Sequence, residues 1–412
     1  MNASPFINPT AIETELVAAF QSRSRVEAHQ TQAFDRFVKL GFPNRRVEGW
    51  KWSDLNAALR QVPTTPKEDA ETDITPSPFA ALHPLEFRIV NGRIELPPEA
   101  LPEGIKYGIM DSMATIPALE AHAIASLTVA MVRKALGIEI EEGVKFERPI
   151  LIRHINSGGG LSFAQSLMRV GQGSAVNIIE TYEGEGSGFY AHLNHMALRD
   201  GAKVHRTVVQ ETGPINILHA ICAVKADGAS RYEQTSLSTG SRLSRHETHL
   251  HYVGRDASAE LRSAALLSGE RHCDFTSHIL HLAEACTTRQ LHKGVARDQG
   301  RTVFQGKFEV ARSAQKTDAK MTANALLLSD MAEANHKPEL EIYADDVECA
   351  HGSTVGALDR DALFYMRQRG LDEAAARGLL IEAFLGEVID GIDNDGVREV
   401  FSARVKSWLE AA

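Results

Sequence analysis

Cysteine is scarce in this chain, and no two cysteines lie close together. The four cysteines are spread over 412 residues and form no Cys-x-x-Cys pair. This spacing disfavours both a disulfide framework and a zinc site built from thiolates alone. We interpret Cys222, Cys273 and Cys286 as ordinary core thiols. Cys349 differs, because a histidine follows it two residues later.

Long apolar runs and a basic surface are also missing. No segment approaches the ~20 apolar residues that a membrane span needs, and residues 1–5 show neither the basic nor the apolar part of a secretory signal. The formal net charge of -10 argues against a nucleic-acid surface, which requires a basic stripe. We therefore expect a globular cytoplasmic protein that engages neither membranes nor nucleic acid.

Two enzyme signatures are absent or defective. Residues 300–308 resemble a phosphate-binding loop, but they have one residue too many between the glycines, and Phe308 stands where Ser or Thr should hold magnesium. We expect this chain to bind no nucleotide. No Gly-x-Ser-x-Gly elbow occurs, so nucleophilic hydrolysis has no support from the sequence.

The middle of the chain repeats itself. Small turn residues recur at Ala202, Ala229, Ala257 and Ala285, which lie 27, 28 and 28 residues apart, and Ser174, Ala314 and Ala344 extend this register. The runs 204–209, 217–224 and 247–253 between them are alternating or β-branched, as in strands. A fixed period of this length predicts a stacked β-solenoid. Hairpins in an antiparallel sandwich would give the same period.

The two flanks have helical patterns. Residues 12–40 read as helical and end at Gly41-Phe42-Pro43, while residues 63–84 have the composition of a loose linker. After Gly356 a 3.6-residue period returns, and Leu379 and Leu380 fall off its stripe. Such a helix packs between two bodies or lies deep in its own domain. We divide the chain into a helical region with a linker and a small α/β segment (1–149), a solenoid (150–355) and a helical domain (356–412). The stripe consists of Ile381, Phe384, Leu385, Val388 and Ile392.

Cys349-Ala350-His351 is the strongest candidate metal site. In an extended segment the two side chains point to the same face, and thiolate with imidazole suits iron, zinc or copper(I). The alternative is a half-buried cysteine beside a turn histidine. Other histidines are interpreted differently: the run 245–251 is expected to be a polar, solvent-facing strand on which at most two imidazoles converge. The group His272, Cys273, His278 and His281 fits no structural zinc spacing.

Several ordered segments resemble one family. Together with the Cys-x-His-Gly of residues 349–352, they are similar to the SufB/SufD family of iron-sulfur cluster assembly proteins, and to its SufD branch in particular. The segments are 41–52, 314–319, 324–334, 338–342 and 363–370.

The resemblance implies a mainly β protein: a right-handed parallel β-helix flanked by N-terminal and C-terminal helical regions. It implies a non-catalytic scaffold subunit that pairs with SufB and binds the ATPase SufC, which hydrolyses ATP. A homodimer is possible when SufB is absent, and the sequence does not decide between the homodimer and the complex. His351, and after it Cys349, would contribute to a transient iron-sulfur cluster shared with SufB. The C-terminal helical domain would bind SufC through Phe364, Tyr365, Leu379, Leu380 and Phe384.

A second class of function stays open at this point. Many parallel β-helices act on polysaccharides as stand-alone enzymes or binding proteins. Such a protein should carry clustered Asp, Lys or Arg and aromatic platforms in successive repeats, whereas aromatic residues make up only 6% of this chain. The sequence favours the scaffold.

Overall fold

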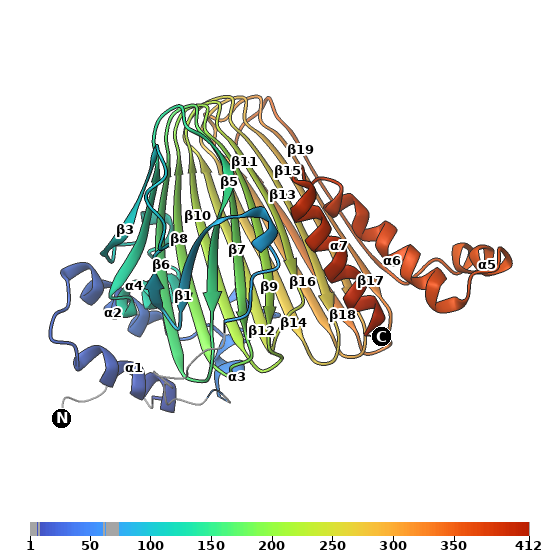
Figure 1. Cartoon of the computed structure of the whole chain (residues 1–412), viewed down its shortest axis with the longest axis horizontal. Helices are drawn as coiled ribbons and strands as arrows, with labels where there is room; N and C mark the ends of the chain where they lie inside the picture. Colours follow the sequence, from blue (N-terminus) through green and yellow to red (C-terminus); the bar gives the residue numbers. More distant parts are fainter. Residues whose placement is uncertain (1–5, 7–8, 61, 63–73, 412) are drawn as a thin grey trace.

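The computed structural model describes residues 6, 9–60, 62 and 74–411. Two sheets face each other, one of ten strands and one of nine, and consecutive strands from β4 onward alternate between them (Figure 1). The strands are β1 (Leu85–Val90), β2 (Arg93–Glu95), β3 (Ile105–Asp111), β4 (Lys134–Ile140), β5 (Lys145–Ile155), β6 (Leu161–Val170), β7 (Ala175–Gly184), β8 (Phe189–Leu198), β9 (Lys203–Thr212), β10 (Ile217–Ala226), β11 (Arg231–Ser238), β12 (Leu243–Tyr252), β13 (Ser258–Leu267), β14 (His272–His281), β15 (Thr287–Ala296), β16 (Arg301–Val310), β17 (Asp318–Leu327), β18 (Glu333–Ile342) and β19 (Glu348–Gly356).

The strand pairing confirms the β-solenoid and excludes the antiparallel sandwich. Every pair from β4 to β19 is parallel and joins strands two apart in the chain, so each coil adds one strand to each sheet. Among the described strands, antiparallel pairing joins β1 to β2 and β3 to β4 at the N-terminal end of the solenoid, and one isolated antiparallel bridge joins Ser241 to His272. Since β1, β4 and the start of β5 precede residue 150, both sheets begin before the expected boundary, and that division stays a prediction.

The turns between coils explain the 27- to 28-residue repeat. They also show that the alanines of the predicted register occupy two different turn positions. In each turn between β4 and β17 that leads from the nine-stranded to the ten-stranded sheet, one residue has a positive φ, and its N–H donates to a carbonyl of the next coil's turn. From Gly173 onward, the residue that follows it is small and buried. Ala202 and Ala257 occupy this second column, as do Ser174 and Ser230, but Ala229 (φ 50°) and Ala285 (φ 58°) lie one residue earlier. The column of residues with positive φ is Gly143, Gly173, Gly201, Ala229, Asp256, Ala285 and Lys316.

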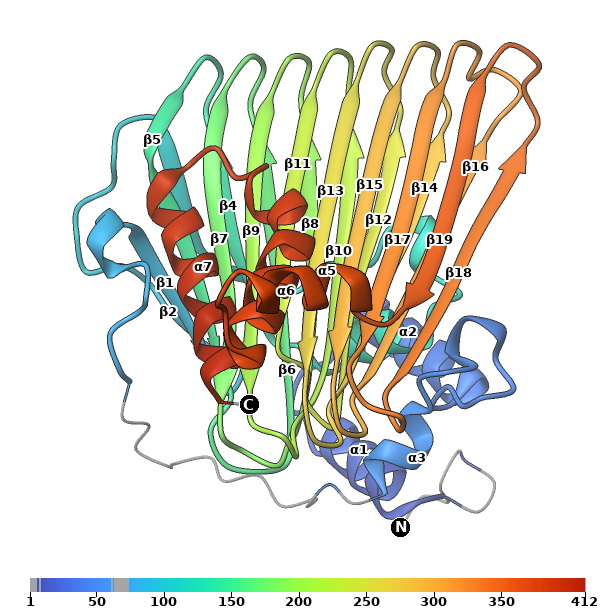
Figure 2. The ribbon, with the colours of Figure 1, turned by 90° about the vertical axis from the view of Figure 1, so that its right-hand side faces the viewer.

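Helices cover the outer faces of both sheets (Figures 1 and 2). Helices α1, α2, α3 and α4 pack on β6, β8, β10 and β12 of the nine-stranded sheet. Helices α6 and α7 pack on the ten-stranded sheet, whereas α5 extends away from it. The helices are α1 (Ala11–Gln21), α2 (Ala28–Leu40), α3 (Leu55–Leu59), α4 (Ala123–Met131), α5 (Arg360–Gln368), α6 (Glu373–Ile389) and α7 (Asp395–Glu410), and the 3-10 turns are η1 (Glu48–Trp50), η2 (Ala80–Leu82) and η3 (Pro117–Leu119).

The helical flanks agree with the periodicities. Residues 12–40 form two helices rather than one, and the second ends before Gly41, whose φ is 66°. Of the expected linker, residues 63–73 lie outside the described part of the chain. On the C-terminal stripe Ile381, Leu385, Val388 and Ile392 are buried, while Phe384 is half-buried. No helix within the described residues is long and apolar enough to cross a membrane.

The segment after α2 is fastened to the nine-stranded sheet. The Arg245 guanidinium lies 4.1 Å from the Trp50 ring centroid and donates to the carbonyl of Gly49 at 2.8 Å. Farther along the sheet, Lys337 Nζ of β18 lies 2.8 Å from a carboxylate oxygen of Glu48. One short N-terminal stretch therefore reaches from β12 to the last coil.

Candidate functional site

The last coil of the solenoid is open. Strands β18 and β19 are the edge strands of the two sheets at this end (Figure 2). Strand β19 pairs with β17, and no other strand of the described chain pairs with its far side. Unpaired N–H and C=O groups on such an edge are a template for association. The large apolar side chains exposed around it are Met331 (68%), Tyr343 (59%), Val355 (47%) and Ile342 (40%).

Cys349 and His351 lie in β19 and share one face, as their spacing predicts. The next residue on that face, Ser353, has its Oγ 2.8 Å from Nδ1 of His336 in β18, across the coil. The face therefore points toward the interior of the open coil. Cys349 is half-buried against the solenoid core, while His351 is exposed. The turn histidine of the alternative interpretation does not occur, since His351 is part of a strand.

Cys349 and His351 differ in how easily each side chain can bind a metal ion. Burial raises the pKa of the Cys349 thiol, although a backbone hydrogen bond from Ala319 works in the opposite direction. A metal ion must therefore displace a proton from this sulfur, because only the thiolate binds metal. The His351 side chain makes no hydrogen bond or ion pair to any described residue, although its backbone belongs to the β17–β19 ladder. Its imidazole is available to a ligand or to a partner protein.

His336 belongs to the same open coil and escaped the sequence analysis. Its Nδ1 faces Ser353, while its Nε2 is buried without a hydrogen-bond partner among the described residues. Burial lowers the pKa of His336 to about 4, so the imidazole is neutral at physiological pH. The sequence could have revealed His336. The strand before β19 must complete the same coil, and the alternation of side chains along that strand places His336 on its inward face.

The residues expected to bind a partner are only partly displayed. Phe364 and Tyr365 on α5 are 64% and 59% exposed, and Leu379 at the start of α6 is 46% exposed. Leu380 is half-buried. Phe384 is half-buried as well, and Lys293 Nζ lies 4.6 Å from its ring centroid. Phe384 thus already contributes to the contact between α6 and the sheet.

A histidine cluster contradicts our interpretation of residues 245–251 as a solvent-facing strand. Residues 245–248 are buried, because the N-terminal segment and α4 cover this part of the nine-stranded sheet. Glu247 accepts from Arg245 and lies within hydrogen-bonding distance of three imidazoles, from the same strand, from β10 and from the start of α4. The three nitrogens are His219 Nε2 (2.8 Å), His249 Nε2 (3.0 Å) and His122 Nε2 (3.2 Å). Spacing within one strand could not reveal ligands supplied by other elements.

A second polar network lies inside the solenoid. Arg206 and Glu180 form a bidentate pair with N–O distances of 3.0 and 2.7 Å, and Arg206 also donates to Gln234 at 2.7 Å. Both charges are shielded from water. Glu180 keeps a pKa of about 2 because the Arg206 charge and hydrogen bonds outweigh the opposing effect of burial. Removing one member of such a pair leaves an uncompensated charge in the core.

Comparison with known proteins identifies relatives over most of the chain. The model of the SufBD core domain of the SUF system for FeS cluster assembly matches residues 153–384, more than half of the sequence. The iron-sulfur cluster assembly protein SufD of Escherichia coli is 27% identical over 389 residues, covering 92% of each chain. The chloroplastic protein ABCI7 of Arabidopsis thaliana is 27% identical over 439 residues, covering 99% of this chain and 91% of its own.

A third relative matches a shorter segment with a higher sequence identity. The SufBD family protein slr0076 of Synechocystis is 38% identical over 173 residues, covering 42% of this chain and 38% of its own. These matches confirm the resemblance to the SufB/SufD family and to its SufD branch.

Proposed function

Because this chain belongs to the SufBD family of the SUF system for iron-sulfur cluster assembly, we propose that it is a SufD-like, non-catalytic scaffold subunit of the SufBCD complex. In this proposal SufB docks against the β18–β19 end of the solenoid, and the ATPase SufC binds α5 and the start of α6. SufC hydrolyses ATP, and this chain binds no nucleotide. Strand β19, whose outer edge pairs with no other described strand and which has Cys349 and His351 on one face, carries the proposal.

The chemistry of the open coil suits a nascent iron-sulfur cluster as cargo. A thiolate and a neutral imidazole are ligands that iron accepts, and a site at a subunit edge can be completed and opened by movement of a partner. His351 is our first choice of ligand because it is exposed and free of internal partners. Cys349 is second, since its thiol must lose a proton whose pKa burial has raised.

The proposed SufC surface consists of the exposed side chains Phe364, Tyr365 and Leu379. Leu380 and Phe384 lie at its margin, where Phe384 also contacts the solenoid side. Deleting the whole C-terminal region would be a poor test, because it would uncover the apolar outer face of the ten-stranded sheet beneath α6 and α7. Point substitutions on α5 avoid this problem.

Two further features belong to the proposal. We place the protein in the cytoplasm, although one relative is named as chloroplastic, and we expect the β18–β19 end to pair two copies of this chain when SufB is absent. The carbohydrate alternative requires aromatic platforms on successive coils. The exposed large aromatic side chains among the described residues are Tyr343, Phe364 and Tyr365, which form no row along successive coils.

The experiment is the substitution His351→Ala, tested after co-expression with SufB and SufC. We expect the complex to form, because an exposed imidazole buries little area, but its iron and sulfide content after anaerobic reconstitution should fall sharply. Cys349→Ala should have an equal or smaller effect.

A matched control is Glu348→Gln, an exposed residue of the same strand that points to the opposite face. It should leave iron and sulfide unchanged. Full iron and sulfide content in the purified His351→Ala complex would refute the proposed role of this histidine.

A further inference from the structure

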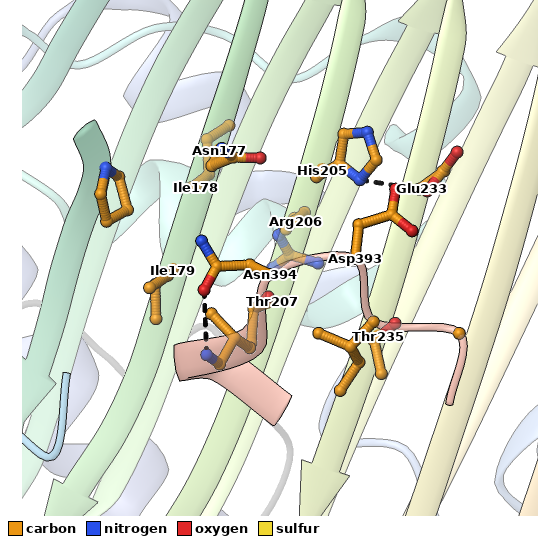
Figure 3. Close-up of a pocket in the computed structure, with 14 residues that line it drawn as sticks. Asn177, Ile178, Ile179, His205, Arg206, Thr207, Glu233, Thr235, Asp393 and Asn394 are labelled. Atoms are coloured by element: carbon orange, nitrogen blue, oxygen red, sulfur yellow. Dashed lines mark hydrogen bonds and ion pairs between the residues drawn. The ribbon is translucent and has the colours of Figure 1, made fainter. Parts of the chain in front are cut away.

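A cavity of about 280 Å³ lies where the loop between α6 and α7 meets the outer face of the ten-stranded sheet. Strands β7, β9 and β11 form its floor, and residues 391–394 of the loop cover it (Figure 3). The cavity is remote from the open coil, since β9 and β11 lie in the middle of the sheet.

Three potential ligands meet at one side of this cavity. His205 of β9 and Glu233 of β11 are direct neighbours in the strand pairing, and His205 Nδ1 lies 3.1 Å from a carboxylate oxygen of Glu233. Asp393 comes from the loop. One ligand atom from each of the three side chains lies within 4.8 Å of the other two, and Figure 3 shows them converging from the sheet and from the loop.

The position of Asp393 is fixed by the loop around it. Arg262 donates to the carbonyl of Gly391 at 3.2 Å, and a Cβ atom at Gly391 would lie 2.4 Å from that guanidinium. Arg398 donates to the carbonyl of Ile392 at 2.9 Å. After Asp393 the chain enters α7, whose N-cap Asn394 accepts from the N–H of Val397 at 3.1 Å. The loop backbone is therefore held in place on both sides of Asp393.

The charges at this place favour a cation. Arg231 compensates Glu233, whereas Asp393 makes no hydrogen bond or ion pair with a described side chain. The N-terminus of α7 offsets part of the Asp393 charge, but the repulsion between two adjacent carboxylates remains.

Two other histidine–carboxylate clusters are already saturated. In the Glu247 cluster, His122 Nδ1 accepts from the N–H of Ala125 at 3.1 Å, so its proton resides on Nε2 and that nitrogen donates to Glu247 instead of binding a metal. Inside the solenoid, both nitrogens of His192 are engaged and Arg206 holds both oxygens of Glu180. In His205, Nδ1 contacts Glu233, but Nε2 has no partner among the described residues, so the proton can move to Nε2 when Nδ1 binds a metal ion.

We propose that His205, Glu233 and Asp393 bind a divalent first-row transition-metal ion, which ties the α6–α7 loop to strands β9 and β11. One imidazole with two carboxylates is a donor set suited to Zn²⁺, Fe²⁺ or Mn²⁺. The ion replaces the repulsion between Glu233 and Asp393 with two attractive contacts. The site is independent of the proposed docking of SufB and SufC.

The test is a titration of the chelator-treated full chain with Zn²⁺, followed by calorimetry. A parallel titration with Co²⁺ distinguishes this site from Cys349, because ligation by nitrogen and oxygen gives no thiolate-to-metal charge-transfer band. Asp393→Asn and His205→Gln should each weaken this binding at least about 10-fold. Hydrogen exchange at residues 391–394 should slow on addition of Zn²⁺ in the wild type but not in Asp393→Asn.

The matched control is Asp390→Asn, which removes an exposed carboxylate from the end of α6 next to the same loop. It should bind Zn²⁺ like the wild type. Two outcomes would overturn the proposal: Asp393→Asn binds Zn²⁺ as tightly as the wild type, or a Cys349→Ser/His351→Ala chain binds no Zn²⁺. Circular dichroism of the metal-free variants confirms that each has folded.

Discussion

Acid should unfold this protein at a pH set by its buried histidines. His192, His219, His246 and His272 are among them, and burial is the main cause that lowers their pKa values. The pKa falls to about 4 for His192, His219 and His272, and to about 3 for His246. In the unfolded chain these imidazoles regain a pKa of about 6.5. The unfolded state therefore binds more protons than the folded state below this pH.

The sign and size of the effect follow from this difference. A lowered pKa in the folded state means that the full stability is present above about pH 6.5 and is lost as the pH falls toward 4. At about pH 5 each imidazole costs roughly 2 kcal/mol, so the four together cost roughly 8 kcal/mol. That loss is comparable with the whole stability of a typical domain, about 5–15 kcal/mol. The carboxylates of Glu180 and Glu233, with pKa values near 2, add their loss only below about pH 4.5.

The measurement is the urea midpoint by circular dichroism between about pH 7.5 and about pH 5. The midpoint should fall steeply, and His272→Gln should reduce the loss of unfolding free energy by roughly 2 kcal/mol, the share of one imidazole. Gly306→Ala is a suitable control, since it lowers stability without removing a titrating group and should leave the slope unchanged. A midpoint that stays level as the solution is acidified, or a His272→Gln chain with the full slope, would refute the reasoning.

Two other predictions concern binding and packing. Phe364→Ala or Tyr365→Ala should weaken SufC binding by about 2 kcal/mol, roughly thirty-fold, because a few aromatic anchors contribute most of the binding energy of an interface. Thermal unfolding of the isolated chain should stay the same. If calorimetry finds unaltered affinity for both variants, the contact with SufC lies elsewhere. Gly306→Ala should lower the free energy of unfolding by about 1–3 kcal/mol, because its Cβ would lie 2.4 Å from the sulfur of a buried methionine. At Gly352 an added Cβ has no neighbour within 4 Å, so Gly352→Ala should leave the urea midpoint unchanged. Equal urea midpoints for the two variants would contradict the packing argument.

The solenoid was predictable from the sequence because its signals are local. Strand alternation and a turn every 27 to 28 residues recur along the chain, and the two-residue spacing alone places Cys349 and His351 on one face. The register of the turn column was harder. Ala229 has a positive φ and Ala202 a buried position, and composition does not distinguish these two uses of alanine.

Features built by distant segments could not be predicted. Residues 245–248 were expected to face solvent, but the stretch around Trp50 covers them. The sequence of the strand gives no indication of this covering segment. Likewise, Asp393 meets His205 and Glu233 only because α6 and α7 fold back over the sheet. Each of these sites depends on packing between elements far apart in the chain, which neither periodicity nor spacing encodes.

The two edge strands at the open end are protected to different degrees. Strand β18 contains Lys337 and Pro338, and lysine and proline are devices that discourage further strand pairing on an edge. Lys337 is also held by Glu48 of the N-terminal segment. Strand β19 has neither lysine, arginine nor proline, and most of its residues are exposed. An unprotected edge is tolerated where association is useful, so we expect the partner of this end to lie against β19, the strand that carries Cys349 and His351.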